Sequence, residues 1–231
     1  MTSLPISLKI ARRLSHWISK NAEATYMRRS LHYVGVQQGD AVYSFTTKAE
    51  LNALYTLALA CPVGADVLEI GSYLGASTCY IAAGLSHGDG HLFCVDTWQN
   101  ETMPDGIRDT FTEFQENTAV FKDMLTLLRK RSDEIASNDI PAALHLVFID
   151  GDHSYDACRH DFHMVTPWLS EDGTIAFHDS NNYSGVSRVI GEALATGKWS
   201  VAGHVGSLLW MRRAVWFDKE FGASPSAALK K

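Results

Sequence analysis

Residues 67–77 read Val67-Leu-Glu-Ile-Gly-Ser-Tyr-Leu-Gly-Ala-Ser77, and this stretch decides the fold. The largely apolar run at 67–70 has the length of a short buried strand. Gly71 and Gly75 then allow the backbone to turn sharply, and an apolar helical segment follows from about Ala76 to Leu85. A strand, a glycine turn and a helix in succession are typical of a parallel sheet with helices on its faces.

The rest of the chain repeats this alternation. We expect further strands at residues 91–95, 125–128, 144–149 and 174–177, and helices at about 106–121, 133–136, 155–169 and 186–195. Residues 171–173 are expected to form a turn. Two last strands, at 199–205 and 207–211, are too close for a helical crossover, so they should pair antiparallel. The predicted fold is an α/β doubly wound seven-stranded sheet, mostly parallel, with an antiparallel C-terminal strand.

Two terminal segments lie outside this alternation. Residues 1–45 are expected to form a helical extension that caps the domain or contacts a second copy of the chain, because apolar residues recur there at helical spacing. Thr47-Lys-Ala-Glu50 is a capping box that should start a helix running to about Ala60. We therefore place the main domain at residues 46–216 and a frayed tail at residues 217–231.

The composition argues against several classes of partner. The chain has 231 residues, of which 46% are hydrophobic and 20% charged, as in ordinary globular domains. Its net charge of −6, without a long basic run, disfavours nucleic-acid binding. The longest uncharged, mostly apolar stretch, residues 51–65, is too short to span a bilayer. The N-terminus has no apolar signal core and the four cysteines form no CxxC pair, so we expect reduced thiols in a cytoplasmic protein.

The residue that ends the second predicted strand indicates a nucleoside ligand. Ligands of doubly wound sheets bind beyond the carboxyl ends of the strands, and an acid at this point, here Asp96, commonly accepts hydrogen bonds from ribose hydroxyls. The first turn is spaced G-x-x-x-G rather than G-x-G-x-x-G, which disfavours a pyrophosphate, and Glu69 would oppose one. The alternative for Asp96 is a cap or loop acid.

Acids and histidines gather after the fourth and fifth predicted strands. Asp150, Asp152 and His153 follow the fourth strand, and His178 and Asp179 follow the fifth. Carboxylates held this close repel one another unless they are protonated or bridged by a cation. Oxygen ligands together with imidazole suit Mg²⁺ or, better, Mn²⁺. The sequence thus predicts a divalent metal at this edge, with loop caps and turn acids as the alternative.

Four motifs in this order resemble the class I S-adenosylmethionine (SAM)-dependent methyltransferases. They are residues 67–77, Val95-Asp-Thr97, Phe148-Ile-Asp-Gly-Asp-His-Ser-Tyr155 and Gly173-Thr-Ile-Ala-Phe-His-Asp179. Within that class the chain resembles the metal-dependent O-methyltransferases, both the catechol type and the branch that methylates macrolide sugars and other natural products. The resemblance covers about residues 45–215, and it implies a Rossmann-like sheet with an antiparallel final hairpin.

The resemblance implies a set of contacts to SAM. The residues that would wrap its methionine half are Glu69, Gly71, Tyr73, Gly75 and Ser77, the last through the methionine carboxylate. The residues that would meet its nucleoside are Asp96 at the ribose, Ser132 and Asp133 at the adenine edge, and Asp150 beside the cofactor.

The resemblance also implies a metal site and a base. Asp150 and Asp179 match metal ligands, and His153 matches the general base. His178 stands where the sugar-methylating branch has an acid, and Ser180 stands where the catechol type has an asparagine. We therefore take His178 as a third candidate ligand, with a weak or empty metal site as the alternative. The predicted reaction is methyl transfer to a hydroxyl of a small hydroxylated acceptor, assisted by Mg²⁺ or Mn²⁺.

Other functions, and purely structural roles for some residues, are the alternatives. A nicotinamide-dependent oxidoreductase would share the wound sheet, although the G-x-G-x-x-G turn is missing. A metal-independent O- or N-methyltransferase and a non-catalytic nucleoside-binding scaffold are the further alternatives. On the helix at 155–169 we expect His160 and His163 to face solvent and Asp161 to be a surface or packing acid. Residues 98–109 could form a lid.

Overall fold

A computed structural model describes residues 33–101 and 106–214 of the chain. The expected helix within residues 1–32, the boundary at residue 216 and the tail at 217–231 lie outside these ranges, as does part of the 98–109 loop. Residues 33–41 are helical. Among the described residues, no helix is both long enough and apolar enough to cross a membrane.

Seven strands form one sheet in the order β3-β2-β1-β4-β5-β7-β6. The strands are β1 (Asp66–Ile70), β2 (His91–Asp96), β3 (Leu125–Arg129), β4 (Leu144–Ile149), β5 (Leu169–Phe177), β6 (Trp199–Val205) and β7 (Leu208–Arg213). Neighbours from β3 to β5 pair parallel, whereas β7 pairs antiparallel with both β5 and β6. The predicted fold, including its antiparallel end, is confirmed.

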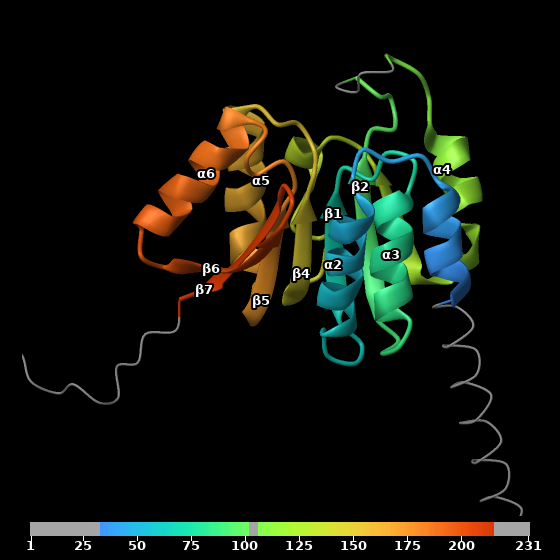
Figure 1. Cartoon of the computed structure of the whole chain (residues 1–231), viewed down its shortest axis with the longest axis horizontal. Helices are drawn as coiled ribbons and strands as arrows, with labels where there is room; N and C mark the ends of the chain where they lie inside the picture. Colours follow the sequence, from blue (N-terminus) through green and yellow to red (C-terminus); the bar gives the residue numbers. More distant parts are fainter. Residues whose placement is uncertain (1–32, 102–105, 215–231) are drawn as a thin grey trace, which may run out of the picture.

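Helices cover both faces of the sheet (Figure 1). The helices are α2 (Lys48–Leu59), α3 (Ala76–Leu85), α4 (Phe111–Asn117), α5 (Tyr155–Val165) and α6 (Ser184–Ala195). Successive residues of β1 point to opposite faces, so Val67 packs in the core under α2 and α3 while Leu68 packs in the core under α5 and α6. Burial on both faces explains why the central strands are apolar runs without alternation.

Three segments differ from the sequence predictions, and each difference lies at the end of an element. The helix expected at 106–121 is α4 followed by a 3-10 turn at Ala119–Met124, because Gly106 adopts a left-handed φ of 89° that cannot begin a helix. Helix α5 ends at Val165 rather than near Leu169, since Pro167 lacks the N–H group that a continuing helix needs. The turn expected at 171–173 lies inside β5.

Candidate active site

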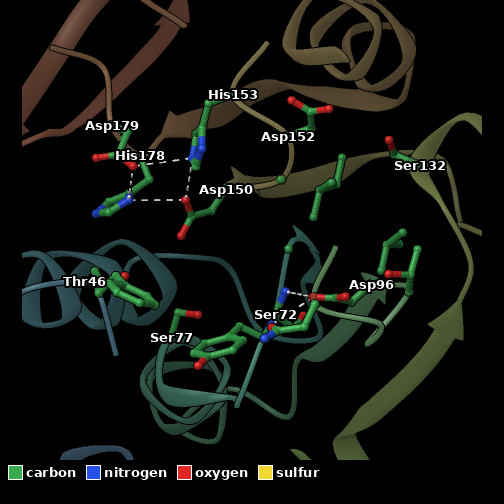
Figure 2. A pocket seen from close by; sticks show the side chains of 18 of the residues that line it. Thr46, Ser72, Ser77, Asp96, Ser132, Asp150, Asp152, His153, His178 and Asp179 are labelled. Carbon is green, nitrogen blue, oxygen red and sulfur yellow. Dashed lines mark hydrogen bonds and ion pairs between the residues drawn. The ribbon is translucent and has the colours of Figure 1, made fainter. Parts of the chain in front are cut away.

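A cavity of about 580 Å³ lies at the carboxyl ends of the parallel strands. Its walls come from the loops that follow β1 to β5 and from residues 43–46, just before α2. Figure 2 shows Ser72 and Asp96 on one side of this cavity and His153, His178 and Asp179 on another. The cavity occupies the place where wound sheets bind ligands, and its volume is that of a small-molecule site.

The loop after β1 runs unusually close to the end of β4. Gly71 has a φ of 87°, and a Cβ atom built on it would lie 2.1 Å from the carbonyl oxygen of Asp150. Tyr73 has a φ of 44° and Gly75 a φ of 92°, so the turn uses the left-handed region three times. Gly71 and Tyr73 line the cavity, whereas Gly75 lies in the turn and does not line it.

Glu69 lies fully buried behind this loop and holds it through three hydroxyl groups. Its carboxylate accepts hydrogen bonds from Ser72 Oγ at 2.8 Å, Ser77 Oγ at 2.6 Å and Thr78 Oγ1 at 2.5 Å. Burial raises the pKa of Glu69 to about 7, although the three hydroxyl groups oppose the rise. Ser77 lines the cavity and Glu69 does not, so Glu69 is placed to orient the loop rather than to touch a ligand.

Asp96 joins the ends of β1 and β2 inside the cavity wall. Its Oδ2 atom accepts backbone hydrogen bonds from Ser72 at 2.8 Å and Tyr73 at 2.9 Å, and its Oδ1 atom accepts one from Trp98 at 2.6 Å. Burial raises its pKa, and these hydrogen bonds oppose the rise. A carboxylate has about four acceptor positions, so Asp96 keeps capacity for a hydroxyl donor such as that of a ribose.

The two residues predicted to meet an adenine edge separate in the structure. Ser132, which follows β3, lines the cavity. Asp133 is exposed, does not line the cavity, and accepts a hydrogen bond from Arg131 Nε at 3.0 Å. The side chain of Ser132 is therefore available to a ligand, while that of Asp133 is engaged in a surface ion pair.

Asp150, His153 and Asp179 form a cluster at the other end of the cavity (Figure 2). Each offers one donor atom, and these atoms lie within 4.8 Å of one another, a spacing that could hold a metal ion. His153 Nε2 lies 3.4 Å from both Asp150 Oδ1 and Asp179 Oδ2. Burial would lower the pKa of His153, but the two carboxylates outweigh it and raise the pKa. Two carboxylates and one imidazole suit a divalent ion that tolerates nitrogen.

His178 lies behind this cluster, not within the metal-like group. Its Nδ1 atom is 3.2 Å from Asp150 Oδ1, and its Nε2 atom faces the other way, 3.4 Å from Ser207 Oγ and 3.5 Å from Glu50 Oε2. Burial would lower the pKa of His178, but the neighbouring Asp150 and Asp179 raise it. Both ring nitrogens thus have protein partners, and the third donor with metal-like spacing is His153, where the sequence predicted His178.

Glu50 lies beside the Nε2 atom of His178, a contact that the sequence analysis did not predict. It is only 2% exposed, and its Oε1 atom accepts hydrogen bonds from the backbone N–H of Ser207 at 2.7 Å and from Ser207 Oγ at 2.8 Å. Burial would raise its pKa, but the hydrogen bonds from Thr47 and Ser207 outweigh burial and lower it to about 2. The sequence shows only the capping box, because Ser207 lies 157 positions further along.

Ser180 and the flanking aromatic residues complete this end of the cavity. Ser180 Oγ donates a hydrogen bond to the carbonyl oxygen of Ser207 at 2.6 Å, so it does not replace the asparagine ligand of the catechol type. Tyr183, which is half exposed, stacks on the His153 ring at a centroid distance of 4.3 Å. Phe45 and Tyr73 also meet at the cavity, with ring centroids 6.0 Å apart. These rings add apolar surface to the wall of the cavity.

Comparison with known proteins identifies the class. Residues 68–180 match the family described as a methyltransferase domain. An S-adenosylhomocysteine (SAH)-bound methyltransferase of Podospora anserina has a TM-score of 0.60 and 12% identity, covering 93% of this chain and 100% of that one. A Bacillus cereus O-methyltransferase in complex with SAH has a TM-score of 0.56 and 17% identity, covering 80% and 89%. The chain has the fold of the class I SAM-dependent methyltransferases.

Two further relatives complete the comparison. A TDP-rhamnose 3′-O-methyltransferase of calicheamicin biosynthesis has a TM-score of 0.52 and 14% identity, covering 70% of this chain and 76% of that one. An uncharacterized protein of Sinorhizobium fredii is 26% identical over 117 residues, which are 49% of this chain and 13% of that protein's length. The match of residues 68–180 to a methyltransferase-domain family favours the transferase interpretation over a nicotinamide-dependent oxidoreductase.

Proposed function

We propose that this chain is a SAM-dependent O-methyltransferase that acts on a hydroxyl group of a small hydroxylated molecule. One observation carries the proposal: a single cavity joins Asp96, which suits a ribose, to the cluster of Asp150, His153 and Asp179. A methyl donor and a hydroxyl that must lose a proton would thus share one cavity. The fold shared with a sugar O-methyltransferase supports a hydroxylated acceptor.

The residues that would hold SAM line the same cavity. The Gly71–Tyr73 loop and Ser77 would meet its methionine half, Asp96 its ribose and Ser132 its base. Glu69 and Gly75 would act from behind by fixing the loop. Bound SAM would supply a methyl group on a positively charged sulfur, ready for an in-line displacement. The protein's task is to hold the acceptor oxygen in line with that methyl group.

His153 is the proposed general base. Its Nε2 atom would take the proton of the acceptor hydroxyl while the oxygen forms its bond to the methyl carbon and the bond from that carbon to sulfur breaks, which releases neutral SAH. Asp150 and Asp179, each with an oxygen 3.4 Å from Nε2, would stabilise the charged imidazolium that results. The stacked Tyr183 ring limits how far the imidazole can rotate.

A divalent ion, Mg²⁺ or Mn²⁺, is part of the proposal. Asp150 and Asp179 would bind it with a rearranged His178 as the nitrogen ligand, which leaves His153 free to act as the base, and it would acidify a bound hydroxyl group. The second candidate is a metal-independent methyltransferase. It is favoured by His178, whose Nδ1 atom, 3.2 Å from Asp150 Oδ1, can supply the compensating donor without a metal.

The remaining parts of the proposal concern the setting of the enzyme. We propose a cytoplasmic protein, which the free thiols of the four cysteines support. We propose that residues 1–45 join copies of the chain, on the helical spacing of apolar residues there. The net charge of −6 supports a small acceptor rather than a nucleic acid.

Calorimetric titration with SAH, with NAD as the control ligand, tests the reaction class. We expect micromolar binding of SAH and no binding of NAD. Binding of neither ligand would contradict the proposed function. SAH binding without turnover on any vicinal diol or catechol would instead support a non-catalytic nucleoside-binding protein.

Chelation tests the role of a metal. With an accepted substrate, we expect EDTA treatment to abolish turnover and Mg²⁺ or Mn²⁺ to restore it, while SAH still binds. Turnover that is unchanged after chelation would favour the metal-independent enzyme.

Replacement of His153 tests the base. We expect His153→Ala to bind SAH within about threefold of the parent and to lower turnover by about 10²-fold or more, because a positioned base contributes rate rather than cofactor affinity. His160→Ala is the matched control, since His160 is an exposed residue on α5. Equal turnover of the two variants would remove His153 from the mechanism.

A further inference from the structure

We infer that Asp161, a residue of α5, recognises the 6-amino group of the adenine of SAM. The inference rests on the proposed binding of SAM and gives the base a second contact beside Ser132. The sequence motifs assign Asp161 no role, and its place on the expected helix predicts a surface or packing acid.

Asp161 is a buried carboxylate that borders the cavity. The residue is one of those that line the cavity, and it is only 1% exposed. Its Oδ1 atom has no hydrogen-bond partner among the described residues. Buried polar atoms are almost always paired, and leaving a charged one unpaired is costly. A donor brought by a ligand would satisfy this oxygen.

The position of Asp161 matches the base rather than the methionine half. It lies beside Gly151, where an added Cβ atom would be 3.6 Å from Asp161 Oδ2. Ser132, after β3, also faces this carboxylate, since it lowers the pKa of Asp161. Asp161 therefore sits between the loops that follow β3 and β4. Figure 2 shows Ser132 and Asp96 on the same side of the cavity and Asp179 on the opposite side.

The chemistry of the carboxylate selects a donor. Burial raises the pKa of Asp161 to about 6, so at pH 8 the group is ionised and can only accept hydrogen bonds. The 6-amino group of adenine has two N–H donors, and a purine without that group has none at this position. Asp133, the other acid near Ser132, is exposed and paired with Arg131, so it offers no comparable acceptor in the cavity.

The test compares SAH with its analogue whose base is unsubstituted purine, by calorimetry at pH 8. We expect the parent chain to bind SAH about 10- to 100-fold more tightly, the range for a hydrogen bond to a charged group. In Asp161→Ala this ratio should fall to within about threefold, because the amino group loses its partner. Asp133→Ala is the matched control and should keep the parent ratio.

Asp161→Asn keeps the shape of the side chain and guards against misfolding of the alanine variant. Its neutral amide should lower the ratio part of the way, at an unchanged melting temperature. A ratio in Asp161→Ala equal to that of the parent, or a parent that binds both ligands equally, would overturn the inference while leaving the proposed function intact. A parent that binds neither ligand would overturn the proposed function itself.

Discussion

Gly71 illustrates how a single residue controls the site. Its backbone has a left-handed φ of 87°, and the position of an added Cβ atom is already occupied by the main chain of Asp150. Because the obstacle is backbone rather than a flexible side chain, it cannot yield without moving the end of β4. The loop after β4 also carries His153, so a displacement caused at Gly71 would move the cluster of Asp150, His153 and Asp179.

We expect Gly71→Ala to lose SAH binding by tenfold or more and to destabilise the chain by more than Gly64→Ala. Gly64 is the matched control, since it also has a positive φ, 72°, but nothing lies within 4 Å of an added Cβ atom. Gly64→Ala should therefore cost only the left-handed backbone, about 1–2 kcal/mol. Urea unfolding and calorimetry measure both effects. Equal losses in the two variants would show that the close approach to Asp150 does not matter.

The sequence can place candidate site residues that lie at or just after the end of a strand. Asp96 is the last residue of β2, Asp150 follows β4 and Asp179 lies two residues after β5, and the structure brings them to one cavity because parallel strands share a carboxyl edge. Residues that reach the site from a helix carry no such signal. The sequence therefore predicts only a surface or packing acid for Asp161, whereas its buried, unpaired oxygen is visible only in the structure.

At the scale of elements, helix α2 contacts the β6–β7 turn beside His178, which lines the cavity. Glu50, in the first turn of α2, accepts hydrogen bonds from the backbone N–H and from the hydroxyl group of Ser207. The Ser207 carbonyl oxygen in turn accepts hydrogen bonds from the backbone N–H of Ser180, at 2.9 Å, and from its hydroxyl group. The loop after β5, which presents Asp179, is thereby fixed by an element from each end of the described chain.

We expect Glu50→Gln to be less stable than the parent by about 1.5–3 kcal/mol at pH 7, the range for hydrogen bonds to a charged group. The folded pKa of about 2 lies below the ordinary value of 4.5, so the carboxylate stabilises the folded state above pH 4.5. That stabilisation is lost as the pH falls from 4.5 towards 2. The gap between parent and variant in urea unfolding should therefore shrink over that range.

Glu113→Gln is the control for this series. Glu113 forms a surface ion pair with Arg108 at 2.7 Å, and such pairs contribute about 0–1 kcal/mol. A gap for Glu50→Gln that is as small as this one at pH 7, or that does not change with pH, would contradict the role assigned to the buried carboxylate.

Element boundaries depend on packing that local sequence does not record. The start of α2 is marked by a capping box and begins as predicted, and α3 and β4 also match the predictions. Of the segment expected to be helical at 106–121, only Phe111–Asn117 forms an α-helix, and Trp98 packs on its residues Phe111 and Phe114. Pattern therefore predicts the elements better than their ends.

At the scale of the whole molecule, the cavity draws on segments from residue 43 to residue 183, so a ligand there links most of the sheet. A ligand that binds only the folded state stabilises it by about 2.7 kcal/mol at a concentration of 100 times its Kd. For a domain of this size that corresponds to a rise in melting temperature of about 5–10 °C. We expect SAH to produce this rise and NAD to produce none. A melting temperature unaffected by SAH would contradict binding in this cavity.

The pairing of Glu50 with Ser207 also bears on how the protein is made. On the ribosome, Glu50 can complete its capping box with Thr47 as soon as α2 has emerged, but its other oxygen has to wait for Ser207, 157 positions later. The entropic cost of closing so long a loop grows only slowly with the length of the loop. The contact between Glu50 and Ser207 therefore forms slowly, but its stability is not much reduced. Until the β6–β7 hairpin has been synthesised, Ser207 cannot cover His178 and water can reach this side of the ring. We therefore expect this wall of the cavity to be completed only after Ser207 has left the ribosome.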